Sequence, residues 1–228
     1  MKPTLYLVPA PLGGPATGSL PTAASETIRS LRDFAVENPK SARAFLGALG
    51  MPCAIRELSM HEIAGDAAAL LAPLRAGRPL GVLAEAGCPA VADPGAALVA
   101  AAHAEGFRVI PLVGPCALLL ALMASGLEGQ RFAFCGYLPR EKMERGERIR
   151  ALERRSRAER ETQIFIETPY RNEALLEALL QCCDAGTRLC VAADLTLPSE
   201  EIATRTVAQW RLARSAIGRR PAVFLLQA

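Results

Sequence analysis

A chain of 228 residues, of which 51% are hydrophobic and 21% charged, can bury a sizeable core, which excludes an intrinsically disordered protein. Its formal net charge of +3 is too small for a protein that coats nucleic acid. The longest apolar run, residues 116–124, is too short to span a bilayer, so we expect no membrane partner.

Short apolar runs alternate with helical patterns through the first half of the chain, which predicts an α/β domain with a mostly parallel sheet. The expected strands cover residues 4–8, 34–36, 80–83 and 107–112. The expected helices cover residues 23–32, 41–49, 63–76, 96–105 and 116–124, with Ser41 as the N-cap of the second.

The second half of the chain has a different residue pattern, which predicts a mixed sheet with flanking helices. We expect strands at residues 131–137, 163–166, 188–193 and 222–226, and helices at 143–157, 172–183 and 208–217. A domain boundary near residues 126–130 divides the chain into an N-terminal α/β domain, 1–126, and a C-terminal α/β domain, 127–228.

The strongest local signal is the segment 84–95, which joins an expected strand to an expected helix and contains two prolines, two glycines and two acids. Glycine allows close approach of backbone to a ligand, and an acid accepts hydrogen bonds from hydroxyls or an amine. Ligands bind at the carboxyl ends of strands in open α/β sheets. The alternative is a rigid turn with a solvated Asp93. The proline- and glycine-rich segment 9–15, after the first strand, is open to the same two interpretations.

Seven cysteines, an odd number without paired metal spacing, and two histidines predict no metal site. The N-terminus carries no secretory pattern, so we expect reduced thiols in a cytoplasmic protein.

Basic residues gather in two places. Residues 140–161 hold nine Arg or Lys against six Glu, and residues 205–220 hold five Arg and no acid. Such runs are typical of a solvated helix face, and a phosphate-facing surface is the alternative.

Six loops in order resemble those of the tetrapyrrole methylase superfamily, and within it the ribosomal RNA small subunit methyltransferase I group. They are residues 9–14, 85–95, 114–117, 136–139, 167–171 and 194–196. That group methylates a ribose 2′-hydroxyl of a cytidine in small-subunit rRNA.

The resemblance implies a two-domain α/β homodimer that binds S-adenosylmethionine in the cleft between its domains and acts on rRNA or a ribosomal subunit. Glu85 suits the ribose diol or a cationic group of this cofactor, and loop amides suit its carboxylate and adenine edges. The cofactor-binding residues that the resemblance implies are Pro11, Glu85, Ala86, Gly87, Val91, Cys116, Ala117, Thr168, Leu195 and Thr196.

Methyl transfer from a sulfonium needs an aligned nucleophile that can lose its proton. Glu167 and Arg171 follow an expected strand inside one of the resembling loops, so either could orient the substrate or assist proton removal. The alternative is a structural ion pair between the two side chains.

The chain also departs from the group's pattern. Its first loop is Pro9-Ala10-Pro11-Leu12-Gly13-Gly14, segment 36–40 lacks an Asp and an Arg, and the sequence ends at Ala228, before the small C-terminal domain typical of the group. Two alternatives therefore stay open: a methyltransferase acting on a tetrapyrrole precursor, and a degenerate member that binds cofactor without catalysis.

Overall fold

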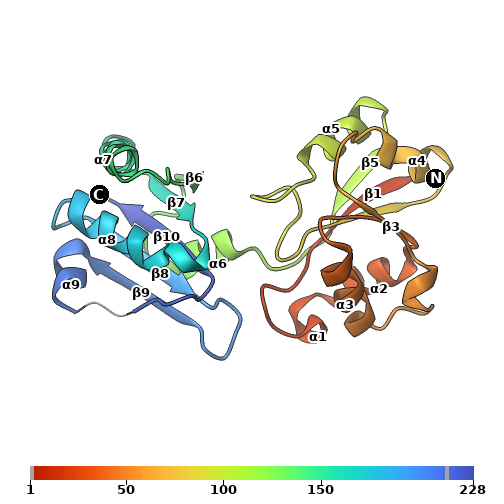
Figure 1. The fold of residues 1–228 in the computed structure, drawn as a ribbon, viewed down its shortest axis with the longest axis horizontal. Helices are drawn as coiled ribbons and strands as arrows, with labels where there is room; N and C mark the ends of the chain where they lie inside the picture. The colour runs from red at the N-terminus through yellow and green to blue at the C-terminus, as the bar shows by residue number, and fades with distance from the viewer. Residues whose placement is uncertain (1–2, 214–215) are drawn as a thin grey trace. The chain divides into compact units, whose positions relative to one another are not determined.

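Two five-stranded sheets, one in each half of the chain, form the framework of the computed structural model, which describes residues 3–213 and 216–228 (Figure 1). The chain divides into unit 1, Met1–Cys116, and unit 2, Ala117–Ala228. The sequence predicts the boundary after the apolar helix of residues 116–124. In the structure this helix packs against strands of the second sheet, so the division precedes it.

The sheet of unit 1 is entirely parallel, with strand order β3-β2-β4-β1-β5. Its strands are β1 (Thr4–Val8), β2 (Asp33–Val36), β3 (Ser59–Glu62), β4 (Leu80–Leu83) and β5 (Arg108–Pro111). The helices are α1 (Ala16–Ser19), α2 (Thr22–Ser30), α3 (Pro39–Leu49), η1 (Ile55–Glu57), η2 (Ala69–Leu71), α4 (Ala72–Arg75) and α5 (Ala96–Ala104). The central strands β2 and β4 are buried along their whole length, and separate apolar clusters form around them.

Unit 2 contains a mixed sheet with strand order β6-β7-β10-β8-β9. Its strands are β6 (Phe132–Tyr137), β7 (Thr162–Ile166), β8 (Arg188–Ala193), β9 (Glu201–Thr206) and β10 (Ala222–Gln227). The first pair is parallel and the other three are antiparallel. The helices are α6 (Ala117–Ser125), α7 (Lys142–Glu159), η3 (Pro169–Arg171), α8 (Asn172–Cys182) and α9 (Val207–Leu212). The core under α7, α8 and α9 includes Phe165 stacked on Phe224, with 6.0 Å between ring centroids.

The expected α/β architecture, with a parallel first sheet and a mixed second sheet, is confirmed. Two strands, β3 and β9, are not predicted by the sequence pattern. Both are edge strands with partly exposed polar residues, and so lack the apolar signal of a central strand.

Three helix expectations need correction. Residues 63–68 are a loop rather than helix, because Gly65 has a φ of +73° and Asp66 accepts a hydrogen bond from the amide of Ala68 at 2.8 Å. The N-cap of α3 is Asn38 and not Ser41, since the Asn38 side chain accepts from the amides of Lys40 and Ser41. The last helix begins at Val207 with a capping box and ends at Leu212, and residues 214–215 of its expected range lie outside the described residues.

Gly81 in β4 tests the close packing of the first sheet. A Cβ there would lie 2.8 Å from Cδ1 of Phe34 and 3.0 Å from Cδ1 of Leu31, both buried. We expect Gly81→Ala to lower the free energy of unfolding by about 1–3 kcal/mol, measured by urea denaturation. Gly129→Ala is the control, because a Cβ there meets nothing within 4 Å. Equal unfolding midpoints for the two variants would contradict this packing.

Candidate functional site

Four loops of unit 1 leave the sheet at its carboxyl edge. Val8 at the end of β1 and Val36 at the end of β2 both align with Leu83 at the end of β4. On the other side of β1, Leu7 aligns with Pro111 at the end of β5. The loops that follow these strands therefore begin side by side, at the position where open α/β sheets bind ligands.

Backbone hydrogen bonds connect these loops. The amide of Ala10 donates to the carbonyl of Gly87 at 2.8 Å, and the amide of Gly87 donates back to Ala10 at 3.0 Å. The amide of Glu85 donates to Oε2 of Glu37 at 3.1 Å, and Sγ of Cys88 lies 3.5 Å from the carbonyl oxygen of Pro115. The loop after β4 is thus tied to those after β1, β2 and β5.

Glycine permits the close approach at two points. Gly87 has a φ of +69°, and a Cβ there would lie 3.3 Å from Cδ2 of Leu12. A Cβ on Gly114 would overlap the ring of Pro9. The loops after β1 and β5 touch only because residue 114 has no side chain.

Three carboxylates gather at this edge and raise the pKa of one of them. Burial has the largest effect on Asp93, followed by repulsion from Glu37 and then Glu85, and together they raise the pKa of Asp93 to about 6. At neutral pH the group is ionised, so the three acids concentrate negative charge. Such an edge attracts a cationic ligand.

In unit 2, the ends of β7 and β8 flank the start of β10. Ile166 and Ala192 align with Val223 from opposite sides, so the loops after β7 and β8 leave the sheet at one edge. Thr168 lies in the first of these loops, and Leu195 and Thr196 lie in the second. Ala117 is the first residue of α6.

Backbone strain concentrates in two of the loops that the sequence selected. Among the described residues, the positive-φ positions other than glycine are Ala90, Ala92, Arg160, Asp194 and Thr196. The first two lie in the loop after β4 and the last two in the loop after β8. Such conformations persist only where surrounding contacts hold them, and they are frequent at functional sites.

Hydrogen bonds and an arginine hold the loop after β8. Ser199 donates to Oδ2 of Asp194 at 2.9 Å, and Oε2 of Glu200 accepts from the amide of Thr196 at 2.7 Å. Arg220 lies 4.0 Å from the Asp194 carboxylate and 2.9 Å from that of Glu201.

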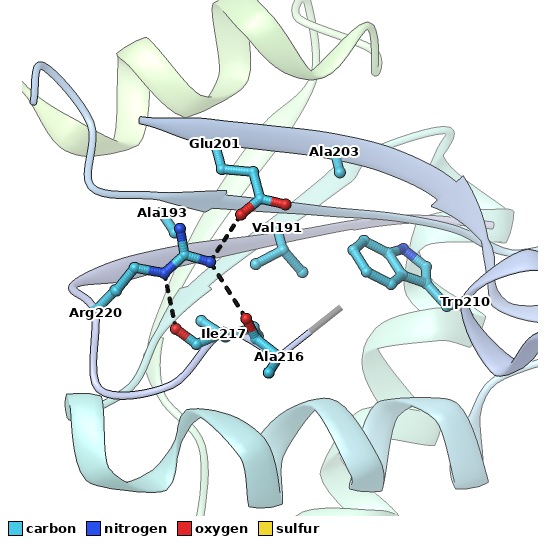
Figure 2. A pocket seen from close by; sticks show the side chains of 8 residues that line it. All are labelled: Val191, Ala193, Glu201, Ala203, Trp210, Ala216, Ile217 and Arg220. Carbon is cyan, nitrogen blue, oxygen red and sulfur yellow. Dashed lines mark hydrogen bonds and ion pairs between the residues drawn. The ribbon is translucent and has the colours of Figure 1, made fainter. Parts of the chain in front are cut away.

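Figure 2 shows Arg220 reaching from the chain before β10 toward Glu201 and the carbonyls of Ile217 and Ala216. The adjacent cavity, which extends to Trp210, has a volume of about 10 Å³. It has room for about one water molecule and none for a cofactor. We therefore assign Arg220 to stabilisation of the loop after β8.

Glu167 and Arg171 form an ion pair, with 3.1 Å between Oε2 and Nη2. The Glu167 side chain is 1% exposed and that of Arg171 is 17% exposed. The other carboxylate oxygen of Glu167 accepts from the amide of Thr168 at 2.8 Å. This geometry favours the structural alternative, in which the pair fixes the loop that carries Thr168.

The structure brings together Pro11, Glu85, Ala86, Gly87 and Val91 on the connected loops of unit 1, with Cys116 following Pro115 at the end of that unit. Glu85, Ala86 and Val91 are exposed, whereas Gly87 is buried. Sequence reasoning missed Glu37, whose carboxylate binds the Glu85 amide. Glu37 directly follows an apolar run, as the segment 84–95 does, and this position is the sequence signal for a site residue.

Within residues 3–213 and 216–228 there is no helix of the length and apolarity needed to span a membrane. In the same residues, no group of three or more His, Cys, Asp and Glu side chains could hold a metal ion. All seven cysteines are free thiols.

Residues 4–210 match the family model of the tetrapyrrole (corrin/porphyrin) methylases. The chain belongs to this family. The match covers most of both units, including the loops at the carboxyl edge of the first sheet and the loops after β7 and β8.

Several relatives carry the name ribosomal RNA small subunit methyltransferase I, in agreement with the predicted resemblance. That of Mesorhizobium japonicum is 34% identical over 91% of this chain and 68% of its own length. That of Escherichia coli O157:H7 is 33% identical over 87% of this chain and 67% of its own length. Among solved structures, diphthine synthase has the same fold, with a TM-score of 0.67 at 14% identity over 99% of this chain and 90% of the other.

The Asp93 carboxylate gives a test of the electrostatics. Its pKa is raised from 3.8 to about 6, so ionisation destabilises the folded protein, and stability is lost as the pH rises through that interval. We expect Asp93→Asn to raise the free energy of unfolding by about 1 kcal/mol near pH 8, a value discounted for partial exposure.

At a pH below the unfolded-state pKa, Asp93 is neutral in both states, so the variant and the wild type should then have equal stability. Urea denaturation across this pH range measures the difference. A stability difference that is independent of pH would contradict the assigned charge repulsion.

Proposed function

We propose that this protein is an S-adenosylmethionine-dependent methyltransferase that methylates a ribose 2′-hydroxyl of small-subunit rRNA. The observation that carries the proposal is the 34% identity to the Mesorhizobium japonicum enzyme, which extends over 91% of the chain. Similarity of this extent favours the rRNA acceptor over a tetrapyrrole precursor, whose methylases resemble this chain mainly in fold.

The connected loops of unit 1 fit the cofactor. S-adenosylmethionine supplies a methyl group on a positively charged sulfur and also carries an ammonium and a ribose diol. Glu85 would accept from the diol or attract a cation, with Glu37 adding negative charge, and the exposed Val91 offers apolar contact to adenine. Pro11, Ala86, Gly87 and Cys116 would contribute backbone and shape.

Ala117, Thr168, Leu195 and Thr196 in unit 2 would supply the remaining cofactor contacts. The Glu167–Arg171 ion pair positions Thr168 through the hydrogen bond between Glu167 and the Thr168 amide. We therefore assign Glu167 and Arg171 as positioning residues. The strained backbone at Asp194 and Thr196 would set the direction of the loop after β8.

Exposed arginines support a phosphate-bearing acceptor. Arg148, Arg150 and Arg154 lie on α7, and within the described part of the chain none of their side chains makes a hydrogen bond or an ion pair. Two acids of the same region are already paired, Glu159 with Arg131 and Glu161 with Arg155. The excess positive charge of α7 is thus available to the RNA backbone.

An apolar row on unit 2 supports the homodimer that the family resemblance implies. Phe132, Phe134 and Tyr137 are exposed on the edge strand β6, and Met123 is exposed on α6. Phe134 aligns with Ile164, so both face the side of the sheet on which α6 packs. We propose this row as the subunit interface.

The proposed rRNA acceptor also supports a cytoplasmic location.

Glu85→Gln tests the cofactor site. Removal of its charge should weaken S-adenosylmethionine binding by about 1 kcal/mol or more, since a charged hydrogen bond or a cation contact is lost. S-adenosylhomocysteine lacks the sulfonium charge. If Glu85 attracts the sulfonium, the variant should therefore lose less affinity for S-adenosylhomocysteine than for S-adenosylmethionine. Calorimetry with both ligands measures this.

The control is Glu26→Gln, which removes the same charge from an exposed position on α2. Unchanged affinity for both ligands in the Glu85→Gln variant would refute the role given to Glu85.

Transfer of a labelled methyl group tests the reaction. We expect label in the small ribosomal subunit or its naked rRNA, at a ribose 2′-oxygen identified by nuclease digestion and mass spectrometry. Label in a porphyrinogen instead would establish the tetrapyrrole alternative. Cofactor binding without transfer to any of these acceptors would favour the non-catalytic alternative.

A further inference from the structure

Unit 1 contains a second feature at its carboxyl edge, a cavity of about 340 Å³. It lies between the loop after β3 and the first turn of α5, and its lining includes Ile63, Ala64, Gly65, Ala67, Asp93 and Ala97. All of these residues belong to unit 1. The volume is in the range of small-molecule sites.

The walls offer apolar contact to a ring. Most lining residues are small or aliphatic, among them Gly95, which is buried and has a φ of +131°. The lining also includes Ile63, Leu70 and Leu98, whose aliphatic side chains offer apolar contact to a ring.

The lining includes hydrogen-bond acceptors and donors. Asp93 supplies an acceptor, and within residues 3–213 and 216–228 its carboxylate makes no hydrogen bond or ion pair. The first-turn amides of α5 supply donors, because its N-cap residue Gly95 has no side chain to satisfy them. An acceptor beside donors is complementary to a ring edge that carries an amino group next to a ring nitrogen or carbonyl.

We propose that this cavity binds one unstacked nucleobase with an exocyclic amino group from the RNA strand, and that Asp93 accepts a hydrogen bond from that amino group. Carboxylates recognise the amino group of cytosine in this way, whereas the carbonyl of uracil at the same position repels them. A base removed from its stack also leaves its ribose accessible. The inference rests on the proposed RNA substrate and makes Asp93 a specificity-determining residue.

The test is a nucleotide titration followed by NMR, with cytidine 5′-monophosphate and uridine 5′-monophosphate as probes. The protein is saturated with S-adenosylhomocysteine so that the cofactor site is filled. We expect the wild type to bind the cytidine nucleotide roughly five- to tenfold more tightly. Asp93→Asn should abolish this preference, because an amide can donate to the uracil carbonyl.

A matched pair of variants tests the location. Ala97 and Ala100 are both exposed on α5, but only Ala97 lines the cavity. Ala97→Trp should fill the cavity and weaken binding of the cytidine nucleotide about tenfold or more, while Ala100→Trp should leave it unchanged.

Three outcomes would overturn the proposal: equal affinity for the two nucleotides, no detectable binding of either at millimolar concentration, or a loss of S-adenosylhomocysteine affinity in Ala97→Trp as large as the loss for the nucleotide. The last would assign the cavity to the cofactor. Intact RNA methylation in the Ala97→Trp variant would contradict this inference and leave the proposed function standing. Discrimination between the two nucleotides without any methyl transfer to RNA would contradict only the proposed function.

Discussion

The reciprocal backbone hydrogen bonds between Ala10 and Gly87 are the constraint on which the carboxyl edge of unit 1 depends. They join the loop after β1 to the loop after β4, which are far apart in the sequence. With Gly87 fixed, the Glu85 amide on one side lies at the Glu37 carboxylate and the Cys88 thiol on the other lies near the Pro115 carbonyl. The ordering cost of these loops is met during folding rather than on ligand binding, so a ligand meets a formed surface.

That fixed backbone brings together groups that would otherwise separate. Glu37 and Glu85 repel the Asp93 carboxylate, and Ala90 and Ala92 occupy backbone conformations that residues with side chains disfavour. Neither feature stabilises the fold. Departures of this kind from local preference are expected where binding rather than stability has shaped a loop.

The parts of the fold that sequence can predict are those whose signal is local. The central strands β1 and β4 are apolar runs bounded by turn residues, and the pattern predicts both. The edge strands β3 and β9 are polar, so only their pairing partners identify them. The alanine and leucine content of residues 63–76 favours one long helix, but the turn at Gly65 and Asp66 overrides composition there.

The same distinction applies to the site. Proline and glycine are local signals, and their density alone marks the loop after β4 as a candidate ligand site. The role of Glu37 depends on the register of β2 against β4, and the cavity beside Asp93 depends on where the loop after β3 lies; both are long-range facts. For Glu167 and Arg171, the spacing in the sequence allows either catalysis or an ion pair, and the contact and burial seen in the structure favour the ion pair.

The fit of Gly114 against Pro9 has a consequence for how these loops can diverge among relatives. Any side chain at residue 114 collides with the Pro9 ring, so such a change is tolerable only alongside a smaller or displaced residue 9. The two positions are therefore epistatic, and neutral drift should alter them jointly or not at all. New acceptor preferences would arise more readily in the segment after β3, where a Cβ on Gly65 would meet nothing within 4 Å.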